Sequence, residues 1–348
     1  MATIKEIANL AGVSTTTVSN VIHGKTGKVS PANIEKINQL IKETGYVQKL
    51  GLRVLNKECS QLIAVVINYH KDFKDSILAD PFYARTLGRI QEQVQSLGYY
   101  LMVYTEKEVE KIFQMVAGWD IDGVIAISFS KRNCEKIFRL TGKPVVAIDA
   151  YGDLEEGQEQ QVMNVSLDEE SGGYMMTRYL LECGYETIKI CAGRDNGVDH
   201  LRLVGGRKAM AEHGSGRQRL QFEALGMNAE KRTESYRWLL QRNTPRTALF
   251  FLSDLYALEA IRFFHEEGVL VPQQIGVAGY DNISYSGLSV PSLTTVSQDV
   301  DKKAQIAVAL LMEQIKGGQE YEKPKEREIL LPVTLIVRKS ARNWTEEA

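Results

Sequence analysis

Apolar residues in the first 46 positions of the chain recur at helical spacing. In three short segments they return at steps of three and four residues, which places them on one face of an α-helix. These residues are Ile4, Ile7, Ala8 and Ala11 in the first segment, Val18, Val21 and Ile22 in the second, and Ile34, Ile37 and Ile41 in the third. The pattern predicts three short amphipathic helices around a small shared core.

Capping residues indicate where these helices begin and end. Thr3 and Glu6 form a capping box, in which the Thr3 hydroxyl accepts from a backbone N–H and the Glu6 side chain reaches back. Ser14 is a good N-cap for the second helix, and Ser30 followed by Pro31 begins the third. Glycines close the three segments: Gly12, Gly24 and Gly45.

The tight glycine turn between the first two helices is typical of a helix-turn-helix. The second helix leaves short polar side chains on its outer face: Thr15, Thr16, Thr17, Ser19 and Asn20. Such side chains allow close approach to a DNA groove, because hydroxyls bond phosphate oxygens or base edges and an amide can pair with adenine. The spacing alone leaves a second interpretation open, a helical cap with a polar solvent face.

From Leu62 onward the hydrophobic pattern is that of an α/β protein. Short β-branched runs alternate with amphipathic helices, which predicts parallel sheets with helices on both faces. A body of about 280 residues exceeds one such sheet, so we expect two lobes with a ligand cleft beyond the carboxyl ends of the strands. The predicted strands are 62–67, 99–104, 123–128, 144–149, 161–167, 187–193, 247–253 and 274–280.

The predicted fold class is therefore α/β, a small all-α helix-turn-helix head followed by a two-lobed body with parallel sheets. We expect the head at residues 1–46, a hinge at 47–60 and the body at 61–340. The length of 348 residues agrees with two or three domains.

Charge is distributed unevenly along the chain. Residues 1–60 hold eight Lys and Arg against four Glu, a net charge of +4, which leaves −6 on the rest. A basic head on an acidic body favours contact between the head and a polyanion. No apolar run reaches the roughly 18 residues of a membrane span, and no signal-peptide segment is present, so we expect a cytoplasmic protein without membrane contact.

The sequence lacks the usual patterns of catalytic residues. The sequence contains no G-x-S-x-G, no Walker loop and no H-E-x-x-H, and its five histidines have no metal-ligand spacing. Its four cysteines are scattered without a C-x-x-C pair, which favours reduced thiols over a disulfide framework or a zinc site. We therefore expect no enzymatic activity, no cofactor and no metal.

The stretch TIKEIANLAGVSTTTVSNVIHG, with VSPANIEKINQLIKETGY after it, resembles the head of LacI-family (LacI/GalR) transcriptional regulators. By this resemblance Thr15, Thr16 and Asn20 read bases, and Asn20 departs from the Arg that many members carry. The resemblance places Ser14, Thr17 and Ser19 at phosphates. Further candidate contacts to double-stranded DNA are Thr3, His23 and Lys28.

The segment VQKLGLRVLNK after Tyr46 stands where relatives have a hinge helix that folds on DNA. By the resemblance Leu55 is a wedge that enters the minor groove and kinks the duplex, which a dimer does symmetrically. Lys49 and Arg53 would contact phosphates, and Leu52 is a further candidate DNA contact. Gln48, Lys49 and Leu52 replace the usual Pro, Asn and Ala. The segment could also be a plain linker with exposed leucines.

The body resembles the regulatory part of the same family, which is similar to periplasmic sugar-binding proteins. Family landmarks include Asp80–Tyr83, Gly279–Asp281 and Pro291–Val296. The resemblance implies three crossings between the lobes, which we expect near 149–161, near 282–291 and close to Leu330.

Candidate effector residues follow from strand ends and from the resemblance. Phe82 and Tyr83 begin a helix and could stack on a sugar or a base. Arg202 and Asp281 match ligand-contacting positions and could bracket hydroxyls or a carboxylate. Two alternatives stay open: Arg202 and Asp281 could pair structurally, and Phe82 could be core. The remaining candidates are Asp149 at a strand end, Ser253 where relatives carry Asn, the adjacent Asp254, and Tyr69 and Asn196 in cleft loops.

Together these features predict a repressor-type regulator that binds a pseudo-palindromic operator as a homodimer, with a sugar-like or nucleobase-like effector in the cleft. The short stretch after the last strand has no room for a heptad helix, which favours a dimer over a tetramer. Two alternatives remain at this stage. A phosphocarrier protein could act as co-repressor, or the chain could be a solute-binding protein without a DNA function.

Overall fold

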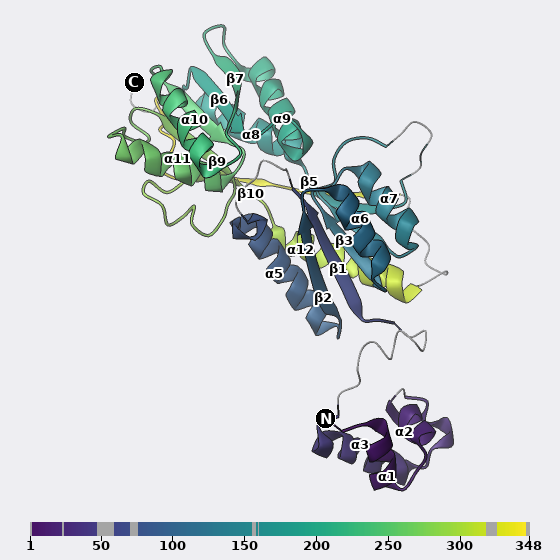
Figure 1. Ribbon diagram of the computed structural model, residues 1–348. Helices are drawn as coiled ribbons and strands as arrows, with labels where there is room; N and C mark the ends of the chain where they lie inside the picture. Colours follow the sequence, from purple (N-terminus) through teal and green to yellow (C-terminus); the bar gives the residue numbers. More distant parts are fainter. Residues whose placement is uncertain are drawn as a thin grey trace. The chain divides into compact units, whose positions relative to one another are not determined.

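The chain divides into two compact units in the computed structural model, Met1–Ser60 and Gln61–Ala348 (Figure 1). The structure describes residues 2–22, 24–46, 59–69, 76–154, 158, 160–317 and 326–345. Five of the candidate DNA contacts lie outside these ranges: His23, Lys49, Leu52, Arg53 and Leu55.

The first unit contains the three predicted helices, and this prediction is confirmed. They are α1 (Ile4–Ala11), α2 (Thr15–Ile22) and α3 (Pro31–Thr44), with a 3₁₀ turn, η1, at Thr26–Lys28. Residues from all three helices form the buried core: Ile7, Ala8, Ala11, Val18, Val21 and Ile37.

The predicted helix caps are also present. The Thr3 N–H donates to Glu6 Oε2 at 2.7 Å and the Glu6 N–H donates to Thr3 Oγ1 at 3.2 Å, which completes the capping box. Ser14 Oγ accepts from the Thr17 N–H at 3.1 Å and so caps α2. Gly12 adopts φ +70° after α1, a left-handed conformation in which the turn to α2 avoids a Cβ clash. Local chemistry thus defines the helix-turn-helix.

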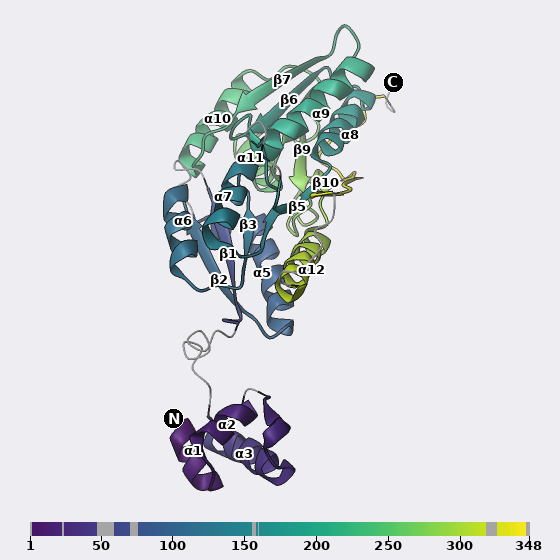
Figure 2. The ribbon, with the colours of Figure 1, turned by 90° about the vertical axis from the view of Figure 1, so that its right-hand side faces the viewer.

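The second unit begins with a lobe built on a fully parallel six-stranded sheet, in the order β11-β5-β4-β3-β1-β2. Helices α5 and α12 pack on one face of this sheet, and α6 and α7 pack on the other (Figure 2). The strands are β1 (Leu62–Asn68), β2 (Tyr100–Glu106), β3 (Gly123–Ile127), β4 (Val145–Ile148), β5 (Met163–Leu167) and β11 (Glu328–Leu331). The helices are η2 (Ile77–Ala79), α5 (Pro81–Ser96), α6 (Val109–Gly118), α7 (Lys131–Thr141) and α12 (Val300–Gly317).

The other lobe has a six-stranded sheet in the order β12-β10-β9-β8-β6-β7, in which only β12 runs antiparallel to its neighbour. Helices α8 and α9 pack on one face, and α10 and α11 on the other. The strands are β6 (Thr187–Ala192), β7 (Arg219–Ala224), β8 (Thr247–Phe251), β9 (Gly276–Asp281), β10 (Thr294–Ser297) and β12 (Thr334–Ile336). The helices are α8 (Glu169–Glu182), α9 (Gly197–His213), α10 (Ala229–Gln241) and α11 (Asp254–Glu266).

Burial on both faces explains why the central strands are continuous apolar runs. In β1, Ile63, Val65 and Ile67 face α5, whereas Ala64 and Val66 face α6, and all five side chains are buried.

Within the described residues no helix is both long and apolar enough to cross a bilayer.

Two of the three predicted crossings between the lobes were wrong. We expected crossings near 149–161 and 282–291, but the chain leaves the first lobe only after β5 and returns only after β10. The third crossing joins β11 to β12 just after Leu330, as expected. The error arose because β5 and β10 each extend a sheet before the chain crosses, and sheet membership depends on long-range pairing that sequence spacing does not report.

Glycine pairs bring α8 and α9 into close contact. A Cβ on Gly173 would lie 1.9 Å from the Arg202 carbonyl oxygen, and a Cβ on Gly205 would lie 1.9 Å from the Glu170 carbonyl oxygen. The Gly205–Gly206 pair, which lies in a helix and not after a strand, therefore serves helix packing. This contact also positions Arg202, which projects from α9 toward the space between the lobes.

We predict that Gly205→Ala destabilises the protein by about 1–3 kcal/mol, because its new methyl group would meet helix backbone that cannot move aside cheaply. Gly88→Ala, at an exposed position of α5, is the matched control, since no atom lies within 4 Å of its ideal Cβ. This change should be neutral or stabilise by up to about 1 kcal/mol through helix propensity. Denaturant unfolding measures both, and equal stabilities for the two variants would contradict the close packing.

Candidate functional site

The outer face of α2 carries the candidate DNA-reading residues. Ser14, Thr15 and Thr16 are exposed, and Thr17, Ser19 and Asn20 are half-buried. Val18 and Val21 point into the head core and fix the rotation of the helix. Because those two are held inward, the polar residues form one continuous outer face.

The amino-terminal end of α2 is suited to anions. Its first turn contains no acidic residue, and the unpaired N–H groups of a helix start carry partial positive charge. Ser14 Oγ lies 2.9 Å from Thr17 Oγ1, so these two hydroxyls hold each other at this end. Lys28 is exposed on the neighbouring 3₁₀ turn. Thr3 is also exposed, but its hydroxyl is occupied by the Glu6 capping box.

In the second unit, a cavity lies between the carboxyl ends of the strands of both lobes. Its larger compartment has a volume of about 460 Å³ and its smaller one about 180 Å³. Small-molecule sites in proteins commonly occupy about 300–1,000 Å³. The residues that line both compartments are Asp80, Tyr83, Ser128, Asp149, Val198, Asp199 and Tyr256. The predicted position, beyond the strand ends, is thus where the cavity occurs.

Left-handed backbone occurs at several strand ends beside this cavity. Ser128, Asp149 and Asp281 have φ values of +60°, +55° and +117°. Each follows or ends a strand, and each lines the cavity. Non-glycine residues adopt such angles at a cost that the surrounding structure must offset, and they concentrate at functional sites. The strain directs these polar side chains toward the space between the lobes.

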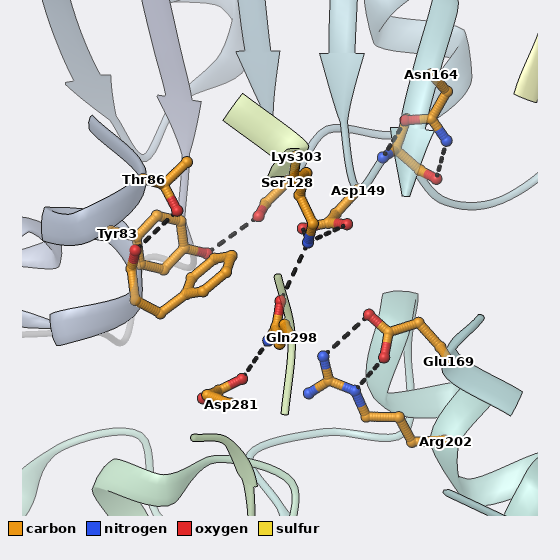
Figure 3. A network of polar contacts seen from close by, with 12 residues as sticks. Tyr83, Thr86, Ser128, Asp149, Asn164, Glu169, Arg202, Asp281, Gln298 and Lys303 are labelled. Atoms are coloured by element: carbon orange, nitrogen blue, oxygen red, sulfur yellow. Dashed lines mark hydrogen bonds and ion pairs between the residues drawn. The ribbon is translucent and has the colours of Figure 1, made fainter. Parts of the chain in front are cut away.

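The structure brings together eight of the nine predicted effector residues. Tyr83 and Asp149 line both compartments, and the smaller compartment also includes Phe82, Arg202, Ser253 and Asp281. Tyr69 and Asn196 line the larger compartment. The Tyr83 hydroxyl lies 3.1 Å from Ser128 Oγ, which directs that ring across the cavity floor (Figure 3).

Asp254 does not line the cavity. Its side chain is fully buried and accepts hydrogen bonds from Thr295 Oγ1 at 2.6 Å, from Ser286 Oγ at 2.5 Å and from the Ile283 N–H at 3.1 Å. Burial raises the pKa of Asp254 to about 7, and these hydrogen bonds oppose the rise. The residue therefore anchors the loop between β9 and β10, and we correct its predicted role to a structural one.

Arg202 is paired with Glu169 and not with Asp281. Its Nε and Nη2 donate to the two carboxylate oxygens of Glu169 at 2.7 and 3.0 Å, and its Nη1 donates to the Leu252 carbonyl at 2.8 Å (Figure 3). The guanidinium also stacks on the Tyr280 ring, 3.7 Å from its centre. Although burial alone would raise the pKa of Glu169, the Arg202 charge lowers it. The guanidinium is thereby held rigidly at the wall of the smaller compartment.

Asp149 and Asp281 are joined by two residues that the sequence analysis did not select. The Lys303 ammonium lies 2.9 and 2.8 Å from the carboxylate oxygens of Asp149, and it donates to Gln298 Oε1 at 3.1 Å. Gln298 Nε2 in turn donates to Asp281 (Figure 3). The sequence contained one sign that Lys303 is unusual. This charged residue occupies an inward-facing position of α12, between the buried residues Val300 and Ala307.

Carboxyl groups dominate the inner walls of the cavity: Asp80, Asp149, Asp199 and Asp281. Burial raises the pKa of Asp281 well above its usual range, and it raises the pKa of Asp199 to about 7 while Arg202 opposes the rise. Within the described ranges, no group of three or more His, Cys, Asp or Glu residues could hold a metal ion. Such walls can accept hydrogen bonds from hydroxyls or N–H groups.

The raised pKa of Asp199 predicts a pH-dependent effect of Asp199→Asn. The folded protein holds this proton more tightly than the unfolded chain, so the residue lowers stability progressively from about pH 4 to about pH 7 and fully above it. Asparagine imitates the neutral form and should therefore raise the melting temperature more at pH 8 than at pH 5. Thermal unfolding at the two pH values measures this, and equal changes would contradict the assignment.

Two family models match the chain. Residues 3–49 match the model of bacterial regulatory proteins of the lacI family, and residues 177–341 match a periplasmic binding protein-like domain. The HTH-type transcriptional repressor PurR of Glaesserella parasuis is 32% identical over 99% of this chain and 100% of its own length. The HTH-type transcriptional regulator CelR of Thermobifida fusca is 30% identical over 97% and 98%.

Solved structures show the same arrangement. A complex of the transcriptional regulator CelR with cellobiose superposes with a TM-score of 0.69 at 28% identity, over 98% of this chain and 100% of that one. A lac repressor dimer bound to operator and the anti-inducer ONPF superposes with a TM-score of 0.81 at 23% identity, over 98% and 99%, which shows likeness of fold. This chain therefore belongs to the lacI family of bacterial regulatory proteins and is a DNA-binding transcriptional regulator.

Proposed function

We propose that this regulator represses transcription from a pseudo-palindromic operator and that a neutral, hydroxyl-rich small molecule in the interlobe cavity controls its affinity for that operator. One observation carries the proposal. The smaller compartment is lined from both lobes by four Asp side chains and by Tyr83 and Tyr256, and its guanidinium, that of Arg202, is already paired to Glu169, whereas Lys107 and Arg194 line only the larger compartment. Because the family is one of regulators, the chain is not an enzyme. A regulator of this kind acts in the cytoplasm, where we place the protein.

In the head, we assign base reading to Thr15, Thr16 and Asn20 on the outer face of α2. We assign phosphate contacts to Ser14 and Thr17 at the amino-terminal end of that helix and to Ser19 in its middle. Lys28 supplies a nearby positive charge. Thr3 serves mainly as the α1 cap.

The hinge residues and His23 remain proposals that rest on the sequence. Leu55 is proposed as the minor-groove wedge, with Leu52 beside it and Lys49 and Arg53 at phosphates. His23 is proposed as a further contact at the end of the reading helix.

The effector class follows from charge and shape. The Asp side chains of the smaller compartment offer no positive charge to a phosphate or carboxylate group, whereas their oxygens accept hydrogen bonds from sugar hydroxyls. Aromatic rings from both lobes supply flat apolar faces to a sugar ring, namely Phe82, Tyr83, Tyr151 and Tyr256. The similar regulator CelR has been solved with cellobiose, which supports a sugar here. A nucleobase or nucleoside is the second candidate, because its N–H groups could also donate to these carboxylates.

Control of the operator requires two states that the effector binds unequally. A molecule held by Asp149 in one lobe and Asp281 in the other would favour one angle between the lobes. In a dimer, that angle sets the separation of the two heads, and operator half-sites require a fixed separation. The proposal holds whether the effector weakens operator binding, as an inducer does, or strengthens it, as a co-repressor does.

Dimerisation is supported by the related lac repressor dimer and by exposed apolar side chains on the second lobe. The loop between β9 and β10 exposes Tyr285 by 60%, Leu288 by 76% and Val290 by 90%. Apolar side chains exposed together in this way are typical of protein contact surfaces. No comparable feature of the described residues supports a phosphocarrier co-repressor, and the helix-turn-helix head argues against a transport protein.

We predict that Asn20→Ala weakens operator binding by about tenfold or more, because a lost side-chain contact to a base costs about 1–3 kcal/mol. Operator fragments selected from the genome by the wild-type protein provide the probe, and fluorescence anisotropy gives the affinity. Asn38→Ala on the exposed face of α3 is the matched control and should bind as the wild type does. Equal affinities of the two variants would remove Asn20 from the reading face.

We predict that cellobiose or another neutral sugar raises the melting temperature in a thermal-shift screen, whereas glucose 6-phosphate does not. A ligand at 100 times its Kd stabilises the folded state by about 2.7 kcal/mol. Adenine and adenosine complete the panel and test the second candidate class. Asp281→Asn should abolish the shift, and Asp120→Asn at the far end of the first lobe should preserve it. A response to the phosphorylated sugar alone would contradict the effector class.

A further inference from the structure

Lys303 is a charged residue in a position that is otherwise apolar. Its side chain is fully buried on α12, a helix that packs against β3, β4, β5 and α5 of the first lobe. Burial of an ammonium group is costly unless all of its hydrogen-bond donors are used. Here all three find acceptors, two on Asp149 and one on Gln298. The position is therefore a specific polar site inside a hydrophobic stripe.

The Gln298 amide can take only one orientation in this arrangement. The Lys303 ammonium group only donates hydrogen bonds. The amide oxygen of Gln298 must therefore face Lys303, and the amide nitrogen then faces Asp281 (Figure 3). Rotation of the amide would set its nitrogen against the ammonium group, which is a repulsive contact. The Lys303 charge thus holds Gln298 in place.

The three contacts connect the two lobes through the second crossing. Asp149 follows β4, and α12 carries Lys303, so both belong to the first lobe. Asp281 ends β9 of the second lobe. Gln298 lies between β10 and α12, in the segment that joins the lobes. Rotation of one lobe against the other about this segment must stretch or break at least one contact of the series.

We propose that Lys303 is a positioning residue that sets the angle between the lobes through Asp149, Gln298 and Asp281, and thereby sets operator affinity before any effector binds. The inference rests on the proposed function for its effect on DNA, but its structural part is independent of that function. Lys303 does not line the cavity, whereas the three residues that it connects do. Lys303 therefore influences effector binding only through these three residues.

The dependence of operator affinity on the lobe angle distinguishes this role from that of an ordinary stabilising contact. A bond present at only one lobe angle changes the balance between the two states, so its removal alters effector-free operator affinity. A contact of equal strength at both angles would alter stability alone. Loss of Lys303 should therefore change both the lobe angle and the affinity for DNA.

The first test measures the lobe angle in full-length protein. Spin labels on Gln114→Cys in α6 and Glu230→Cys in α10, in a Cys59→Ser background, report the separation of exposed sites on the two lobes. Lys303→Met removes the charge and keeps an unbranched side chain. The neighbouring Lys302→Met is the matched control, because Lys302 is exposed on the same helix. We expect a shifted or wider distance distribution for Lys303→Met and the wild-type distribution for Lys302→Met.

The second test measures operator affinity of the same proteins by fluorescence anisotropy, without added effector. We expect Lys303→Met to change the affinity by about fivefold or more, a typical size for coupling between sites, and Lys302→Met to leave it unchanged. Should Lys303→Met fail to fold, the double variant Asp149→Asn/Lys303→Met replaces it, because removal of both charges leaves neither one buried and unpaired.

Each outcome has a definite meaning. An unchanged distance distribution overturns the inference, as does a changed distribution with operator affinity equal to that of the wild type. If wild-type protein binds no genomic fragment, the proposed function fails, and the distance measurement still decides whether Lys303 sets the lobe angle.

Discussion

Sheets that are covered by helices on both faces leave most polar chemistry to their strand ends. In each lobe the central strands are buried from both sides, so their side chains are mostly apolar, and a polar one such as Asn164 of β5 needs its own hydrogen-bond partners. The residues that can act on a ligand therefore gather beyond the carboxyl ends, where Ser128, Asp149 and Asp281 also adopt left-handed backbone. Two such sheet ends that face each other produce one cavity, and the predicted effector residues other than Asp254 lie around it.

Buried charge in this cavity is compensated locally. Glu169 neutralises Arg202 within the second lobe, and Lys303 neutralises Asp149 within the first. Burial raises the pKa of Asp149 against the opposing Lys303 charge, and it also raises the pKa of Asp199 and Asp281. The two complete pairs make each wall rigid, and the amide of Gln298 links one wall to the other. A ligand that donates hydrogen bonds then meets acceptors whose positions are already fixed.

The head obeys a different constraint, because its core is very small. Six buried side chains fix three helices, and local caps define where each helix begins. With Val18 and Val21 turned inward, α2 has no freedom to hide its hydroxyls, so its reading face follows directly from its apolar face. The chain is thus built from two separate units, one large with two lobes and one small and locally determined.

The amino-acid sequence by itself determined the local features of this protein. The three head helices, the capping box at Thr3 and the alternation of strands and helices could be predicted, because capping and periodicity act over a few residues. The placement of Tyr83 beside a cavity followed from its position after a strand, and that of Asp281 from the family resemblance. The β7, β10, β11 and β12 strands and the α10 and α12 helices were not predicted, and two of the lobe crossings were predicted wrongly.

Only the tertiary structure decided which residues meet across the fold. Lys303 reaches Asp149 over 154 positions of sequence, Arg202 pairs with Glu169 and not with Asp281, and Asp254 faces a loop and not the cavity. These outcomes depend on sheet order and helix packing, which bring distant segments together. Sequence spacing contains no measure of that distance, so the partners of buried charges become known only from the folded chain.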